Sequence, residues 1–250
     1  MSKLKFGGSK DLTTGNPMKL ILNFGVPLLF GMLFQQFYNM VDSVIVGKQL
    51  GVNALAAVGS TGSINFMVLG FCIGICNGFA IPIAQAFGAK DTNRLKSYIA
   101  KVLTIIIGIF TKDILTVMRT PADIFDDAYI YIFIIFMGIP ATILYNMVSG
   151  VLRSLGDSFT PVVFLIFSSI LNIILDLILV KRMGVSGAAV ATVTAQAVSG
   201  IICLIYTVKK YRHLNFNKDD WRISTKQMLQ LCKMGIPMGL QYSITAIGSV

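Results

Sequence analysis

Two aspartates inside apolar stretches are the residues of this chain best placed to do chemistry. Asp42 and Asp176 each interrupt a hydrophobic run long enough to cross a membrane. A carboxylate at the centre of a bilayer costs about 2.5–3.5 kcal/mol on insertion scales, so such residues usually serve a function. We therefore predict that both carboxylates are functional.

Polar neighbours share helix faces with these two aspartates. Asn172 lies four residues before Asp176, and helical spacing of three or four places residues on one face. The same spacing joins Asp42 to Gln35, Tyr38 and Asn39, which form a polar stripe on an otherwise apolar segment. Further amide and hydroxyl oxygens come from the apolar segment after Asp176, at Thr192, Thr194 and Gln196.

Two carboxylates with amide and hydroxyl oxygens suit a hard cation such as Na⁺. They suit a proton relay equally, because neighbouring carboxyl groups titrate as a pair. The structural alternative is a set of hydrogen bonds that only fix helix packing, which is common for neutral polar residues such as Asn172 and Thr194. We expect no cofactor beyond a bound H⁺ or Na⁺.

Enzymatic chemistry has little material in this sequence. The single histidine, His213, lies in a polar segment, which disfavours a zinc site or a Ser-His-Asp triad. The four cysteines resemble small core residues more than a disulfide framework. A membrane-embedded enzyme is therefore a weak alternative, and we predict that the chain is not an enzyme.

The composition indicates a polytopic membrane protein. The 250 residues are 55% hydrophobic and 13% charged, with a mean hydropathy of +0.76. Soluble domains carry about 25% charged residues, so a soluble domain and a disordered chain are both excluded. We predict an all-α bundle of membrane helices. The net charge of +10 comes from bases between apolar blocks, which is a topology signal and no sign of nucleic-acid binding.

Six apolar segments are long enough, or nearly so, to span a membrane in about 20 residues. They predict a first lobe over residues 20–208, between a polar segment at 1–19 and a polar linker at 209–233, with a further helix starting at 234 and reaching 250. The third segment is the weakest, because only residues 102–110 are uninterruptedly apolar. The expected helices are 20–46, 54–87, 98–117, 128–151, 162–180 and 185–208.

The distribution of basic residues predicts the orientation. If all six segments cross, most of the 21 Lys and Arg residues fall on the side of the N-terminus. Cytoplasmic loops carry the excess of Lys and Arg. We therefore expect a multi-pass protein of the cell membrane with a cytoplasmic N-terminus.

Prolines and glycines predict local features. Pro27 removes a backbone donor from the helix that carries Asp42 and could let that helix bend. Glycines at 70, 74 and 78 predict a face for close helix packing. The sequence DSFTP at 157–161 predicts a helix start with Thr160 as its cap. The motif GVP at 25–27 recurs as GIP at 235–237, which indicates a second helical unit like the first.

An ordered series of motifs resembles the multidrug and toxic compound extrusion (MATE) family of cation-coupled antiporters. The matching stretches are GNP at 15–17, GVP at 25–27, QQFYNMVD at 35–42, QAFGAKD at 85–91, GVLRSLGD at 150–157, NIILD at 172–176 and GVSGAA at 184–189. The resemblance implies two six-helix lobes around a cavity, and export of small lipophilic or cationic compounds in exchange for H⁺ or Na⁺.

The resemblance also implies roles for individual residues. The cation-coupling cluster would be Asp42, Asn172, Asp176 and Thr194, and Pro27 would be the family's first-helix proline, with a conformational role. Gln35, Tyr38 and Asn39 would face the substrate cavity. The implied partners are membrane lipid, the substrates, and either a second lobe or a second half-transporter chain.

This sequence departs from the family pattern in two ways. The third segment is about a dozen residues short, and the chain reaches only the start of a seventh helix. Two alternatives to an antiporter therefore stay open: a related flippase for lipid-linked precursors, and a nonfunctional transporter fragment.

Overall fold

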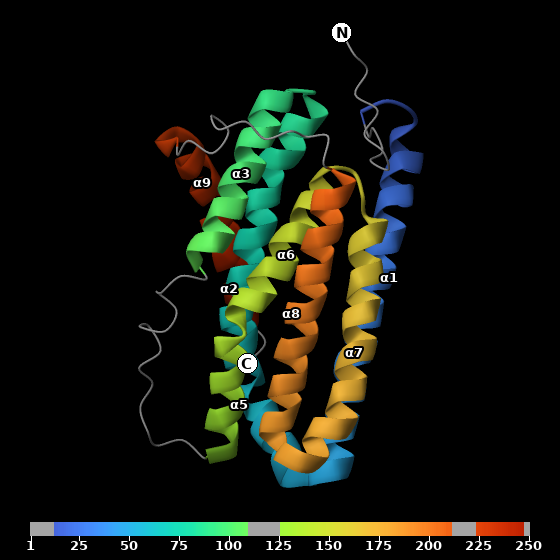
Figure 1. Ribbon diagram of the computed structural model, residues 1–250, viewed down its shortest axis with the longest axis vertical. Coiled ribbons are helices and arrows are strands. Elements are labelled where there is room, and N and C mark those ends of the chain that lie inside the picture. The colour runs from blue at the N-terminus through green and yellow to red at the C-terminus, as the bar shows by residue number, and fades with distance from the viewer. Residues whose placement is uncertain (1–12, 110–125, 212–223, 248–250) are drawn as a thin grey trace.

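The protein is a bundle of long α-helices (Figure 1). The computed structural model describes residues 13–109, 126–211 and 224–247, and these contain no β-strand. The predicted all-α membrane bundle is therefore confirmed. The helices are α1 (Pro17–Leu50), α2 (Val52–Gly88), α3 (Thr92–Ile109), α5 (Asp126–Met137), α6 (Ile139–Ser154), α7 (Phe159–Met183), α8 (Val185–Lys210) and α9 (Thr225–Ile247).

The bundle has two ends, which we name from Figure 1. The upper end holds the start of α1, the α2–α3 turn, the α6–α7 loop and the end of α8. The lower end holds the α1–α2 and α7–α8 turns. Asn16 begins α1, where its side chain accepts hydrogen bonds from the backbone N–H groups of Met18 and Lys19. At the lower end Gly51 joins α1 to α2 with a φ of 85°, a conformation that favours glycine.

In the part of the chain that the structure describes, four helices are long and apolar enough to cross a membrane, namely α1, α2, α7 and α8. The pair α5 and α6 is bent by 43° at its break and makes a fifth crossing if the two helices form one span. The expected single helix at 128–151 is thus two helices that meet at Gly138. Pro140, in the first turn of α6, explains the break, because a proline lacks the N–H that would continue the helix of α5.

The weak third segment is α3, which begins earlier than predicted. Asp91 begins this helix, accepting a hydrogen bond of 3.0 Å from the backbone N–H of Arg94. The 18 residues of α3 rise about 27 Å. Residues 110–117 of the predicted helix lie outside the described residues, as do 1–12, 212–223 and 248–250 of the predicted flanking segments.

Two buried clusters form the core. The upper cluster joins α2, α3 and α6 through side chains such as Ile83, Leu95 and Leu152, all at most 1% exposed. The lower cluster joins α1, α7 and α8 through Val46, Val180 and Ala189. In the described residues the core is therefore divided by depth into two clusters.

Helix α9 packs along α2 through glycines on both helices. A Cβ added at Gly74 or Gly78 would lie 2.5 Å from a backbone oxygen of α9. A Cβ added at Gly235 or Gly239 would meet the rings of Phe79 or Phe71 at less than 3 Å. The predicted close-packing face is confirmed, and its partner is the helix that carries the repeated GIP motif.

Candidate functional site

The carboxyl groups of Asp42 and Asp176 meet between α1 and α7. Both helices run from the upper to the lower end, and each aspartate lies about 10–12 Å before the lower end of its helix at 1.5 Å per residue. The two side chains therefore reach the same depth, where their carboxyl groups interact with each other. Asp176 is fully buried, whereas Asp42 is partly exposed.

Asn172 holds Asp176 from one turn above. Its amide nitrogen donates to Oδ2 of Asp176 at 2.7 Å, and its amide oxygen accepts from the backbone N–H of Thr192 at 3.0 Å. The amide orientation is the one in which both of its polar atoms find partners. The side chain is 2% exposed, so α7 and α8 are joined by polar contacts in a buried place.

Two tyrosines complete the group that we call the carboxylate cluster: Asp42, Asp176, Asn172, Thr192, Tyr38 and Tyr131. Tyr38 interacts with Thr192 and with both aspartates, and Tyr131 of α5 interacts electrostatically with the same two aspartates. Tyr131 was not predicted, and only its position inside an apolar run could have drawn attention to it.

The structure places Thr194 away from this cluster. Thr194 is exposed, because it lies two residues after Thr192 and therefore about 200° further around α8. Thr192 contributes a hydroxyl to the cluster, and the structure does not bring Thr194 together with Asp42 and Asp176.

The predicted polar stripe of α1 is divided between two environments. Tyr38 turns toward α8 together with Asp42, whereas Gln35 and Asn39 are exposed. The Asn39 amide donates to Oε1 of Gln36 at 3.3 Å, on the outer side of the helix. Pro27 lies inside α1, which continues through it, about 22 Å along the helix from Asp42.

The carboxylate cluster offers acceptors for a cation. Oδ1 of Asp42 and Oδ1 of Asp176 are buried and have no hydrogen-bond partner. Buried carboxylate oxygens are normally paired or bound to a metal ion. Among the described residues no three His, Cys or acidic side chains gather as a metal site would require. Two carboxylates with neutral oxygens instead suit a proton or a hard monovalent cation.

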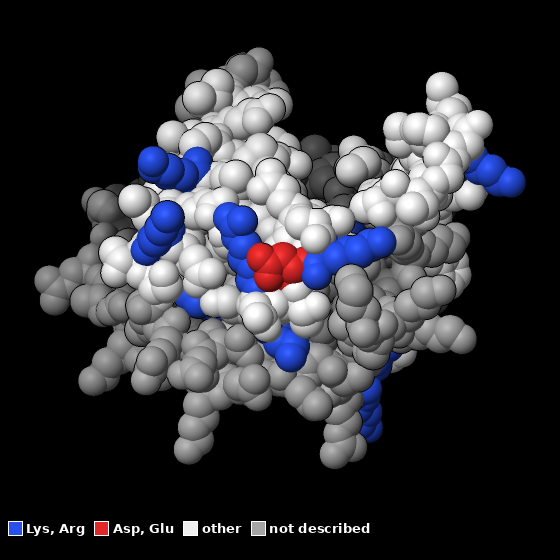
Figure 2. Space-filling view, turned by 90° about the horizontal axis from the view of Figure 1, so that it is seen from above, with Lys and Arg blue, Asp and Glu red and all other residues white. Residues whose placement is uncertain are grey.

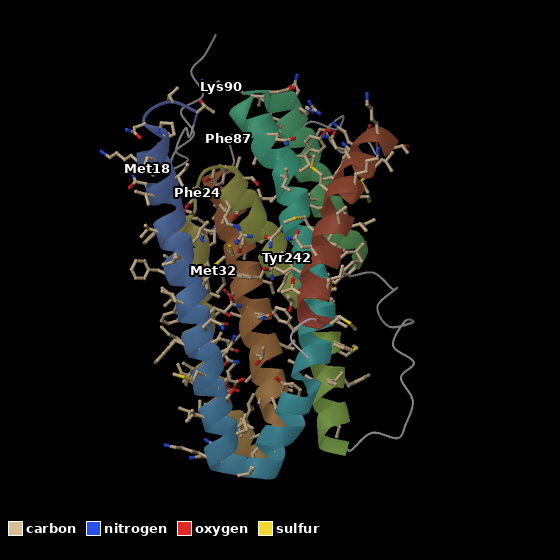
Figure 3. The ribbon with its side chains drawn as sticks, turned by 180° about the vertical axis from the view of Figure 1, so that it is seen from behind. Met18, Phe24, Met32, Phe87, Lys90 and Tyr242 are labelled. Atoms are coloured by element: carbon tan, nitrogen blue, oxygen red, sulfur yellow. The ribbon has the colours of Figure 1, made fainter. Side chains whose placement is uncertain are left out.

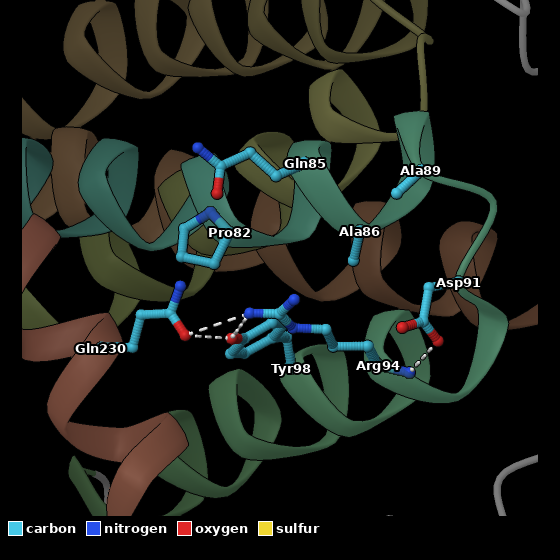
Figure 4. A pocket seen from close by; sticks show the side chains of 8 residues that line it. All are labelled: Pro82, Gln85, Ala86, Ala89, Asp91, Arg94, Tyr98 and Gln230. Carbon is cyan, nitrogen blue, oxygen red and sulfur yellow. Dashed lines mark hydrogen bonds between the residues drawn. The ribbon is translucent and has the colours of Figure 1, made fainter.

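A small cavity of about 200 Å³ lies at the upper end between α2, α3 and α9 (Figure 4). The Arg94 guanidinium donates to the Tyr98 hydroxyl at 3.4 Å and to Oε1 of Gln230 at 3.5 Å. Nearby, the Ser97 hydroxyl donates to Oε1 of Gln227 at 2.9 Å. These contacts join α3 to α9, so we interpret the cavity as part of an interhelix contact.

The α6–α7 loop is tied to the end of α8 by an ion pair. Nζ of Lys210 lies 2.7 Å from Oδ2 of Asp157. Asp157 also accepts from the backbone N–H and the hydroxyl of Thr160. Burial raises the pKa of Asp157, but these hydrogen bonds outweigh it and hold the pKa below its usual range. The side chain of Asp157, and not that of Thr160 as predicted, therefore accepts a backbone N–H from the first turn of α7, whose N-cap position is Ser158.

The fold and the carboxylate cluster define an integral membrane protein of bundled helices with a buried acid pair. Residues 27–178 match the family MatE, more than half of the chain, and the chain belongs to that family of multidrug and toxic compound extrusion transporters. MATE proteins are transporters and not enzymes. The family predicted from the motifs is thus confirmed.

Relatives and solved structures agree with this membership. The chain is 32% identical to the "Probable multidrug resistance protein YoeA" of Bacillus subtilis (strain 168), over 91% of this chain and 53% of YoeA. It is 32% identical to "Probable multidrug resistance protein YpnP" of the same organism, over 95% of this chain and 56% of YpnP. The chain spans about half the length of these curated relatives.

The fold matches a structure described as the outward-facing conformation of a multidrug resistance MATE family transporter of the MOP superfamily. The TM-score is 0.82 at 24% identity, and the match covers 97% of this chain and 56% of that chain.

Proposed function

We propose that this chain is the first lobe of a secondary multidrug efflux transporter of the cell membrane, which exchanges H⁺ or Na⁺ for lipophilic or cationic compounds. The observation that carries the proposal is the meeting of Asp42 and Asp176 with one unpartnered, buried oxygen each. Ionisable residues within membrane helices mark ion pathways and proton relays.

The geometry supports a coupling step at the carboxylate cluster. Two ionised carboxylates at hydrogen-bond distance repel strongly in a medium of low dielectric constant. A proton or Na⁺ between Asp42 and Asp176 removes that repulsion and holds α1 against α7. Release of the cation lets α1 move, and Pro27 weakens the backbone ladder of α1 along the way.

The substrate path would run beside the exposed side of α1. Gln35 and Asn39 are exposed there among large apolar residues such as Met32 and Met40. Figure 3 labels Met32 on this helix, where its side chain is exposed. Substrate sites of such transporters lie between helical repeats. In the proposed transporter a second lobe, on the same or another chain, would cover this side.

Basic residues support a cytoplasmic upper end. Figure 2 looks onto that end and shows many Lys and Arg side chains there. Among the described residues, those at the lower helix ends are Lys48, Lys181 and Arg182, and those at the upper helix ends are Lys19, Lys90, Arg94, Lys96, Arg153, Lys209, Lys210 and Lys226. By the positive-inside rule the N-terminus is then cytoplasmic.

The test is cation binding by the purified chain in lipid nanodiscs. We expect Asp42→Asn to lower the Na⁺ affinity by about 10-fold or more, because one of two charged ligands is lost. If the ion is H⁺, the variant should release fewer protons on titration, because one of the two carboxyl groups is missing. Asp91→Asn is the matched control, since asparagine caps a helix as well as aspartate does. Varying pH and Na⁺ separately identifies the ion. Unchanged binding of both ions by Asp42→Asn would reject the coupling site.

A further inference from the structure

A second polar group lies in the upper half of the bundle, where α2, α6 and α9 meet. We call Arg153, Asn77 and Tyr242 the arginine cluster. The Arg153 guanidinium donates to Oδ1 of Asn77 at 3.0 Å, and the Asn77 amide nitrogen donates to the Tyr242 hydroxyl oxygen at 3.3 Å. Figure 3 labels Tyr242 on α9, where this helix passes α2.

The direction of these hydrogen bonds fixes what the cluster offers to a ligand. A guanidinium has five N–H donors and no acceptor. The Asn77 amide oxygen accepts from Arg153, and an N–H of the same amide donates to the Tyr242 hydroxyl oxygen. The O–H of Tyr242 is therefore free to donate to a ligand. The groups that remain are therefore the other N–H groups of Arg153 and the phenol O–H of Tyr242, all of them donors.

The charge of Arg153 has no acidic partner in the described part of the chain. The groups that interact with it electrostatically are the side chains of Tyr145, Tyr242 and Cys76. The ion pair seen among the described residues is Lys210 with Asp157, at the upper end. Arg153 is mostly buried beside core residues such as Cys76 and Leu152. Buried charges are usually paired, because it costs much free energy to move a charge out of water without giving it a partner.

We propose that the arginine cluster binds the anionic group, a carboxylate or a phosphate, of a molecule that the transporter carries. The inference rests on the proposed transport function and extends its substrates to lipophilic compounds that bear an anionic group. The planar guanidinium matches two oxygens of a carboxylate or phosphate, and the Tyr242 hydroxyl adds a neutral donor. Asn77 and Tyr242 are partly exposed, and a ligand would reach the cluster from their side.

The two clusters are separated by depth. Arg153 is one residue before the upper end of α6, whereas Asp42 lies about 12 Å before the lower end of α1. An anionic group at the arginine cluster therefore does not displace a cation from the carboxylate cluster. The molecule fitted by this arrangement is an organic anion, and a phospholipid headgroup is the other source of the same chemistry.

The experiment measures fluorescence anisotropy of 5-carboxyfluorescein, an anionic dye, with the full chain in phosphatidylcholine nanodiscs. We expect Arg153→Gln to weaken dye binding by about 10- to 100-fold, the effect of losing hydrogen bonds to a charged group. The cationic dye rhodamine 6G should bind Arg153→Gln as well as the unaltered chain. Arg182→Gln is the matched control, because Arg182 is exposed at the lower end. Equal carboxyfluorescein binding by Arg153→Gln would overturn the proposal.

Asn77→Asp provides an independent test that keeps the arginine. The new carboxylate would pair with Arg153 in place and neutralise it, so the chain should stay folded and lose carboxyfluorescein binding by at least about 10-fold. Tyr242→Phe should cause a smaller loss, about 2- to 10-fold. Retained dye affinity in a folded Asn77→Asp chain would refute the proposal even if Arg153→Gln does not fold.

Two further arms separate the sources of the anion and the two proposals. If phosphatidylglycerol in the nanodisc abolishes dye binding, and excess 5-carboxyfluorescein cannot displace that lipid, the ligand is a lipid headgroup and the substrate proposal is wrong. If dye binding persists, the organic anion is supported. Asp42→Asn should leave carboxyfluorescein binding intact, so failure of the coupling site and failure of the anion site give different results.

Discussion

The carboxylate cluster and the arginine cluster occupy one bundle but present opposite chemistry. The first ends in two buried acceptor oxygens, on Asp42 and Asp176. The second ends in donors, on Arg153 and Tyr242. Each sits in its own half of a core that is divided by depth. Because the two clusters lie at different depths, the carboxylates of Asp42 and Asp176 do not form ion pairs with Arg153. Side by side, these opposite charges would neutralise each other.

The two clusters also differ in the parts of the chain that build them. The carboxylate cluster comes from α1, α5, α7 and α8, which precede the linker. The arginine cluster needs Tyr242 of α9, which follows it. Disturbing the α2–α9 contact should therefore affect only one of the two.

The largest effect is expected from Gly78→Ala. The added Cβ would lie 2.5 Å from the Met234 carbonyl oxygen, and backbone on both sides leaves little room for adjustment. Such overpacking costs about 1–3 kcal/mol and would push α9 from α2. We expect a lower melting temperature and at least about 10-fold weaker carboxyfluorescein binding, with Na⁺ or proton binding unchanged.

Gly25→Ala is the control for this prediction, because nothing lies within 4 Å of a Cβ at Gly25. If Gly78→Ala weakened dye binding and cation binding equally, the arginine cluster and the carboxylate cluster would not be independent of each other.

A paired substitution on α8 sharpens the description of the carboxylate cluster. Thr192→Val removes the hydroxyl that contacts Tyr38 and Asn172, and should weaken cation binding by about 2- to 10-fold. Thr194→Val has the same size change on an exposed position and should have no effect. Cation titrations of both variants in nanodiscs measure these losses of affinity. A larger loss in Thr194→Val than in Thr192→Val would support the predicted role of Thr194 in cation binding.

The smallest effect concerns Asp157, a charge that is fully partnered and should bind no ligand. Its pKa is depressed when the protein is folded, so its stabilising effect is present above the unfolded pKa, near 4, and is lost as pH falls through the lower folded pKa. Asp157→Asn should lower the free energy of unfolding by about 1 kcal/mol at pH 7.

Thermal unfolding between pH 3 and pH 7 measures this contribution. The difference between Asp157→Asn and the unaltered chain should shrink below pH 4, and carboxyfluorescein and cation binding should not change. A constant difference across that range would show that the ion pair with Lys210 contributes nothing.

Much of the fold follows from local patterns. Apolar length predicted the long helices, and the spacing of Asn172 and Asp176 placed both side chains on one face of α7, where the structure has them. The break at Gly138 was within reach of the same reasoning, because Pro140 is visible in the sequence. Threonines 192 and 194 could not be told apart, because their types are identical and only the packing of α8 on α7 sets which one points inward.

The sequence by itself determined the class of the protein, its helices and the presence of two costly aspartates, because hydropathy and helical period act over short stretches of chain. Only the tertiary structure decided which polar groups meet. Asn77, Arg153 and Tyr242 come from three helices far apart in sequence, and their contact depends on how closely the glycines of α2 and α9 let two backbones approach.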